Sequence, residues 1–172
     1  WCVVTRGDRA AKTGWGYPSM FPALAVIDPD LTLTLPAAIT ARSGMDALCR
    51  AVEALLASRR QPTSDLLALE AVQIVSRHLP TAVADGRNRE ARTLLMWAST
   101  AAGIGRSLSA GLSLRALAHA LGGHVPDLPH GLALALLARP YFAWFGKARP
   151  QRFDLLAAAM GRDALDARDR SE

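Results

Sequence analysis

The stretch "SGMDALCRAVEALL", residues 43–56, repeats apolar side chains at the spacing of an α-helix. We expect these side chains to lie on one buried face of that helix. They are Met45, Leu48, Val52, Leu55 and Leu56. On the same helix, Asp46 stands one turn before Arg50 among mostly apolar neighbours. The pair is therefore either an ordinary ion pair or the remainder of a metal site.

The chain after Thr40 is predicted to be helical throughout, with breaks at proline and glycine. Helices are expected over about residues 43–58, 62–78, 89–107 and 112–123, with a short one from Pro80 to the turn at 85–88 and two more beginning near 130 and 150. Two β-branched runs, residues 1–5 and 23–28, are predicted strands. The sequence thus predicts an all-α domain at 39–172, preceded by a β fragment and connection at 1–38.

Composition and charge narrow the class of protein. The 172 residues are 51% hydrophobic, which favours a packed domain. The net charge is +5, but the basic residues are scattered among acids, which argues against a nucleic-acid partner. No apolar run reaches the ~18 to 20 residues that a membrane span needs. The two cysteines lack metal-type spacing and favour a reducing, cytoplasmic compartment.

Three of the four histidines crowd into residues 113–131. His119 lies on an apolar helix, where a lone histidine is most often a core residue. His130 follows Pro129 at the start of a helix, which suits a ligand or a proton donor. Asp46, His119 and His130 together would make a mixed oxygen and nitrogen site for a divalent metal.

Three segments identify a family when taken in order. They are "ALAVIDPDLTLTLPAAITARSGMDALCRAVEALL" (23–56), "PTSDLLALEAVQIVSRHLPTAVADGRNREAR" (62–92) and "SLRALAHALGGHVPDLPHGLALALLARP" (113–140). Their succession resembles the helical C-terminal domain of the iron-containing (group III) alcohol dehydrogenases, which have a dehydroquinate-synthase-like fold and include the maleylacetate reductases. The resemblance implies a two-domain enzyme whose nucleotide-binding domain precedes residue 1 and whose helices continue past residue 172.

The resemblance also implies a site for iron or zinc. The family's four ligands fall at Asp46, Arg50, Arg115 and His130 of this chain. Only Asp46 and His130 keep a side chain that can bind a metal, because a guanidinium stays protonated below a pH of about 12. We therefore expect that the family's metal is not tightly bound here. His124, in a loop about one residue longer than usual, is a possible replacement ligand.

Two interpretations of the arginines remain open. In the first, Arg50 and Arg115 are catalytic and take over the metal's electrostatic role, by polarising a carbonyl or by holding a substrate carboxylate. In the second, the metal site has decayed and the arginines merely pair with Asp46. By resemblance, His119 lines the nicotinamide side of the cleft, where it is both a catalytic and a cofactor-binding residue, and His130 closes the metal side.

The sequence therefore predicts part of an NAD(P)-dependent oxidoreductase with a degenerate metal site. Hydride would pass between the nicotinamide of NAD or NADP, held mainly by the preceding half, and a small alcohol, aldehyde or ketone. One alternative is a metal-independent, maleylacetate-reductase-like enzyme acting on a carboxylated ketone. Another is a catalytically inactive helical domain kept for partner contact. We expect no membrane partner, a possible homodimer, and no hydride transfer by this fragment alone.

Overall fold

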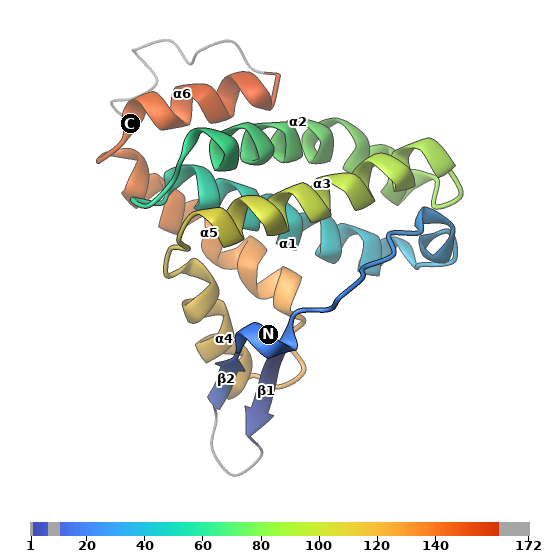
Figure 1. The fold of residues 1–172 in the computed structure, drawn as a ribbon, viewed down its shortest axis with the longest axis horizontal. Helices are drawn as coiled ribbons and strands as arrows, with labels where there is room; N and C mark the ends of the chain where they lie inside the picture. The colour runs from blue at the N-terminus through green and yellow to red at the C-terminus, as the bar shows by residue number, and fades with distance from the viewer. Residues whose placement is uncertain (1, 7–10, 162–172) are drawn as a thin grey trace.

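The computed structural model describes residues 2–6 and 11–161, and helices dominate them (Figure 1). The helices are α1 (Ala37–Leu56), α2 (Pro62–Ala84), α3 (Arg89–Leu108), α4 (Leu114–His124), α5 (His130–Gly146) and α6 (Pro150–Ala159). Two strands, β1 (Cys2–Arg6) and β2 (Ala11–Trp15), and two 3-10 turns, η1 (Pro18–Met20) and η2 (Pro29–Thr32), come before them. The fold is all-α with a short N-terminal β fragment, as the sequence predicts.

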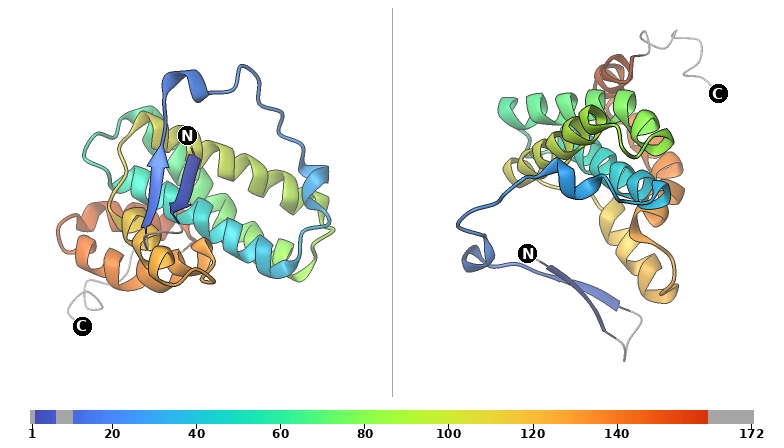
Figure 2. Two further views of the ribbon diagram at one scale, coloured as in Figure 1. Left: turned by 90° about the horizontal axis from the view of Figure 1, so that it is seen from below. Right: turned by 90° about the vertical axis from the view of Figure 1, so that its right-hand side faces the viewer.

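The N-terminal strands form a hairpin. β1 pairs antiparallel with β2, from Cys2 opposite Trp15 to Arg6 opposite Ala11. The prediction of a strand at 23–28 is wrong: these residues have no regular secondary structure, and most of them are exposed. Among residues 2–6 and 11–161 the sheet has only the strands β1 and β2, and the run at 23–28 pairs with neither of them. Figure 2 shows the connection from the hairpin to α1 running along the outside of the helices.

The main hydrophobic core lies between α1, α2 and α3, with Leu156 of α6 against it. On α1, Val52, Leu55 and Leu56 are buried as predicted, whereas Met45 and Leu48 are only partly buried. A smaller cluster joins α1, through Cys49, to Leu114 of α4 and Leu134 of α5. α1 therefore contacts both clusters and is the central helix of the fold.

α2 continues through Pro80, where the sequence predicts a break. Proline lacks the N–H that a helix bonds to the carbonyl four residues earlier, so its presence inside a helix is unfavourable. Ala82, beyond Pro80, is fully buried. Packing of the last turn into the core thus maintains the helix past the proline.

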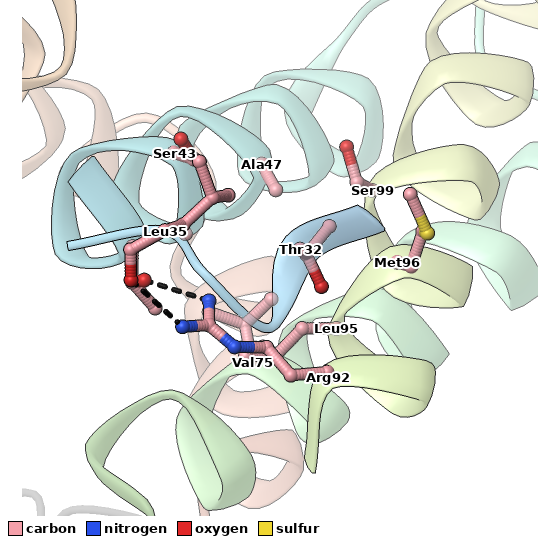
Figure 3. A pocket seen from close by; sticks show the side chains of 11 residues that line it. Thr32, Leu35, Ser43, Ala47, Val75, Arg92, Leu95, Met96 and Ser99 are labelled. Carbon is pink, nitrogen blue, oxygen red and sulfur yellow. Dashed lines mark hydrogen bonds between the residues drawn. The ribbon is translucent and has the colours of Figure 1, made fainter. Parts of the chain in front are cut away.

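α1 begins at Ala37, about six residues before the predicted start. Arg92 of α3 stabilises this early turn from across the molecule. Its Nη1 donates to Thr40 Oγ1 at 2.7 Å, its Nη2 to the Leu35 carbonyl at 3.1 Å and its Nε to the Gly86 carbonyl at 2.9 Å. Figure 3 shows Arg92 directed at Leu35, beside a cavity of about 240 Å³ that Val75, Leu95 and Met96 also line. The arginine therefore connects the start of α1, and the residue just before it, to the turn between α2 and α3.

No helix among residues 2–6 and 11–161 is long and apolar enough to cross a membrane.

Candidate functional site

One large pocket brings together all five residues that the sequence singles out. Its volume is about 1160 Å³, and it opens between the hairpin and helices α1, α3, α4 and α5. The five are Asp46 and Arg50 of α1, Arg115 and His119 of α4, and His130, the first residue of α5. His124 is exposed at the end of α4 and does not line this pocket, so the structure gives no support for it as a replacement ligand.

Asp46 is bound by both arginines, one to each carboxylate oxygen. Arg50 Nη2 donates to Asp46 Oδ2 at 2.7 Å, across one turn of α1. Arg115 Nη1 donates to Asp46 Oδ1 at 2.8 Å from α4. Asp46 and Arg50, the pair in the opening stretch of sequence, thus belong to a network with Arg115 that spans α1 and α4. A carboxylate held in this way has fewer lone pairs left for a cation.

Arg115 also contacts His130. Its Nη1 lies 3.2 Å from His130 Nε2. Since an arginine nitrogen can only donate, Nε2 must accept, which puts the ring proton on Nδ1. The pKa of His130 is lowered to about 4: burial is the largest cause, the charge of Asp46 opposes it, and the charge of Arg115 acts in the same direction as burial. His130 is therefore neutral, and its 3.6 Å separation from Asp46 Oδ1 is not an ion pair.

His119 lies beside His130, with ring centroids 4.9 Å apart. Its pKa is also lowered, chiefly by burial and then by the charges of Arg115 and Lys12. Two neutral imidazoles thus border a pocket wall whose positive charges belong to lysine and arginine. Such rings can accept or donate a hydrogen bond without adding a charge of their own at neutral pH.

Glu53 and Arg106 belong to the same wall, although the sequence analysis did not select them. Glu53 Oε2 lies 3.5 Å from Arg106 Nη1 and 3.8 Å from Arg115 Nε. Glu53 is fully buried, burial raises its pKa, and its Oε1 has no hydrogen-bond partner within residues 2–6 and 11–161. The spacing Asp46, Arg50, Glu53 places all three on one helix face and could have indicated the glutamate. No comparable signal marks Arg106.

Gly131 sets the distance between α5 and α1. A Cβ at this position would collide with the backbone carbonyl of Arg42, which cannot move aside as a flexible side chain can. The absence of a side chain lets the first turn of α5 approach α1 closely. His130, the neighbouring residue, is thereby brought within reach of Asp46 and Arg115.

These residues do not fit a bound divalent metal. Arg115 Nη1 stands between Asp46 Oδ1 and His130 Nε2, the two atoms that would otherwise face a cation. In the part of the chain that the structure describes, no group of three or more His, Cys, Asp or Glu side chains is arranged to hold a metal. Catalytic zinc sites use three protein ligands. Here only Asp46 and His130 could serve as ligands, and the permanently charged guanidinium of Arg115 contacts both of them.

Comparison with known proteins agrees with this arrangement of helices. Residues 40–172 match the model of the "Fe-containing alcohol dehydrogenase family, C-terminal". The chain belongs to the iron-containing alcohol dehydrogenase family. The resemblance found in the three sequence segments is therefore confirmed, and the chain is part of an oxidoreductase family.

Three members of the iron-containing alcohol dehydrogenase family illustrate the similarity. The 1,3-propanediol dehydrogenase of Klebsiella pneumoniae is 36% identical over 99% of this chain and 45% of its own length. An iron-containing alcohol dehydrogenase from Thermotoga maritima superposes with a TM-score of 0.83 at 31% identity, over 95% of this chain and 44% of its own. The maleylacetate reductase of Rhizobium sp. strain MTP-10005 has a TM-score of 0.81 at 31% identity, over 89% and 43%. The chain spans less than half the length of each.

Proposed function

We propose that the complete protein containing this chain is an NAD(P)-dependent oxidoreductase that interconverts a small alcohol and its aldehyde or ketone without a metal ion. In this proposal residues 39–172 form the substrate domain, and a nucleotide-binding domain elsewhere in the protein holds the cofactor. The support is the family membership together with the pocket that the helices form.

A single observation carries the metal-free part of the proposal. Arg115 Nη1 lies within 2.8 Å of Asp46 Oδ1 and 3.2 Å of His130 Nε2. The guanidinium thus contacts the two residues at which the family pattern retains its ligands. The guanidinium is positively charged, as a metal ion would be, so it can stabilise negative charge that develops on a substrate oxygen. Unlike a metal ion, it cannot coordinate the substrate.

The proposed reaction uses the nicotinamide as the hydride donor or acceptor. During reduction, hydride reaches the carbonyl carbon, negative charge develops on the carbonyl oxygen, and a proton completes the alcohol. The charge of Arg115 stabilises that oxygen, and Arg50 binds the second oxygen of Asp46, so that both carboxylate oxygens are paired with a guanidinium. His119 lines the same pocket and is our candidate for contact with the nicotinamide. Its neutral ring can take the hydroxyl proton when an alcohol is oxidised, and the imidazolium formed in this way returns a proton to the oxygen in the direction of reduction.

The experiment measures metal content and activity together on the complete protein. After purification without chelator, elemental analysis is expected to find well under about one equivalent of iron or zinc per chain. Reduction of a panel of small aldehydes by NADH or NADPH is expected to persist after treatment with EDTA. Stoichiometric metal, with activity that disappears on chelation and returns with zinc or iron, would overturn the metal-free mechanism. Metal-free protein with no turnover of any aldehyde would instead favour a catalytically inactive helical domain.

A further inference from the structure

The cavity beside Arg92 adjoins the large pocket in which Asp46 and Arg115 meet. It has a volume of about 240 Å³ and lies between α1, α2, α3 and the chain around η2. Ser99 of α3 lines both the cavity and the large pocket. On α1, Ala47 lines the cavity and its neighbour Asp46 lines the large pocket. Figure 3 shows Ala47 and Ser99 on the side of the cavity away from Arg92. The two spaces therefore meet at Ser99.

The cavity and the large pocket are successive parts of one groove between α1 and α3. On α1 the residues that line the cavity fall within 40–47, and those that line the large pocket fall within 46–50. On α3 they fall within 92–99 and 99–108. A helix advances about 1.5 Å per residue, so the two spaces are displaced by roughly 7 Å along α1 and roughly 12 Å along α3. A chain of several carbons can therefore extend from one space into the other.

The polar groups that line the cavity already have partners. The hydroxyls of Thr32, Thr40 and Ser43 each donate to a backbone carbonyl three or four residues earlier. Each nitrogen of the Arg92 guanidinium donates to a backbone carbonyl or to the Thr40 hydroxyl. The Ser99 hydroxyl has no hydrogen-bond partner among residues 2–6 and 11–161, and it lies where the cavity meets the large pocket.

The rest of the lining is mainly carbon. It includes the side chains of Leu35, Ala47, Val75, Leu95 and Met96. A polar group placed deep in the cavity would lose its hydrogen bonds to water and find few free partners, which is unfavourable. An apolar group would leave water at no such cost. An apolar cavity of about 150 Å³ holds benzene in another protein, so about 240 Å³ has room for a tail of about six carbons.

We propose that the cavity binds the apolar tail of the substrate, which is a primary alcohol with a linear alkyl chain, or the corresponding aldehyde. The carbon that exchanges hydride lies in the large pocket near Arg115 and His119, and the chain passes Ser99 into the cavity. This inference rests on the proposed function, since it assigns the substrate class of the same site. The length and polarity of the chain, rather than a charged group, then determine which alcohols are oxidised.

The first test is a series of alcohols of increasing length, oxidised by the complete protein with NAD or NADP. The value of kcat/KM is expected to rise by about three- to fourfold for each methylene added between butan-1-ol and octan-1-ol, because each buries apolar surface in the cavity. Octane-1,8-diol has the same length but carries a hydroxyl at the far end of its chain. Its kcat/KM is expected to be at least about tenfold below that of octan-1-ol. Equal values along the series would overturn the inference.

The second test changes the cavity itself. Ser99→Leu fills the junction, so the kcat/KM of octan-1-ol relative to butan-1-ol is expected to fall by about tenfold or more. Met96→Ala enlarges the cavity and is expected to raise kcat/KM for nonan-1-ol relative to octan-1-ol by about threefold. Thr93→Leu, at an exposed position of α3 outside both linings, is the matched control and should leave both ratios unchanged. The same ratios in Ser99→Leu and Thr93→Leu would show that the tail lies elsewhere.

A binding measurement separates this inference from the proposed function. Saturation-transfer NMR is expected to detect octan-1-ol on the complete protein, with an affinity that falls by about tenfold in Ser99→Leu and stays unchanged in Thr93→Leu. That result in a protein that oxidises no alcohol would refute the oxidoreductase activity and leave the apolar site standing. Turnover that is independent of chain length, with no octan-1-ol binding, would refute the tail site and leave the activity standing.

Hexane tests whether the cavity and the reaction share one ligand. Because hexane has no hydroxyl, it is expected to bind in the cavity, to compete with octan-1-ol and to inhibit butan-1-ol oxidation much less. If hexane binds and leaves octan-1-ol oxidation unchanged, the cavity is a separate apolar site and the assignment to the substrate tail is wrong. Circular dichroism and a thermal melt of each variant exclude unfolding as the cause of a lost signal.

Discussion

Arg92 and Arg115 are both buried arginines, with 3% and 8% of their surfaces exposed, but they have opposite kinds of partner. Arg92 donates to two backbone carbonyls and a hydroxyl, all of them neutral. Arg115 contacts a carboxylate and an imidazole, with a second carboxylate at 3.8 Å. A guanidinium among neutral acceptors connects segments of the fold, whereas one among ionisable groups at a large pocket is placed for chemistry.

Replacing both Arg50 and Arg115 by histidine should have the largest effect of the changes proposed here, and the quantity affected is zinc affinity. In the complete protein, Arg50→His together with Arg115→His returns two neutral ligands beside Asp46 and His130 and removes two charges that repel a cation. Zinc affinity is expected to rise by a factor of about 10³ or more, roughly 4 kcal/mol or above. Elemental analysis and competition with a chromophoric chelator measure it.

The corresponding single variants serve as controls for that change. Each leaves one arginine in the network around Asp46, so each should gain much less metal than the double variant. Equal metal binding by Arg115→His alone and by the double variant would show that Arg50 does not oppose the cation.

Arg92→Met should have the next largest effect, and it should be confined to stability. The change leaves the carbonyls of Leu35 and Gly86 and the Thr40 hydroxyl without their donor, which is expected to lower the free energy of unfolding by about 3 kcal/mol. Urea denaturation of the complete protein measures this change. A loss within about 0.5 kcal/mol would mean that Arg92 does not hold the start of α1.

Replacing each arginine by lysine should change the free energy of unfolding least. The two lysine variants should nevertheless differ clearly from each other. A lysine at 115 keeps a positive charge near Asp46 and His130, so Arg115→Lys should cost only about 1 kcal/mol of stability. Arg92→Lys should cost more, because a single ammonium cannot reach three acceptors that the planar guanidinium contacts through three different nitrogens. Parallel urea melts compare the two, and the reverse order would contradict the roles given to these arginines.

Local sequence pattern was sufficient for features within one helix. The helical spacing predicted a buried face, which is confirmed for Val52, Leu55 and Leu56. The four-residue separation of Asp46 and Arg50 allowed an ion pair as one of two interpretations, and the structure contains that ion pair. Both follow from helical geometry, which depends only on nearby residues. The grouping of His130 with Asp46 was proposed from the placement of the histidines, whereas the addition of Arg115 was expected only because the ordered segments resemble a known family.

Features that depend on distant packing were missed. The early start of α1 depends on Arg92, which is 52 residues from Thr40. The continuation of α2 through Pro80 is accompanied by complete burial of Ala82, which the local sequence does not indicate. Arg106 joins the pocket because α3 ends beside α1, and nothing in its own neighbourhood of sequence indicates that. In each case a tertiary contact outweighs the local preference of the chain.

The contact at Gly131 sets a limit on how this pocket can change during evolution. Every replacement of glycine adds a Cβ, and here the Cβ meets the backbone of Arg42 rather than a side chain that could adapt by a new rotamer. The groups facing the pocket can be exchanged one by one, as arginine for histidine, without altering the helix spacing. Position 131 has no such freedom, so in a saturation mutagenesis experiment we expect it to tolerate fewer replacements than the charged residues whose positions it determines.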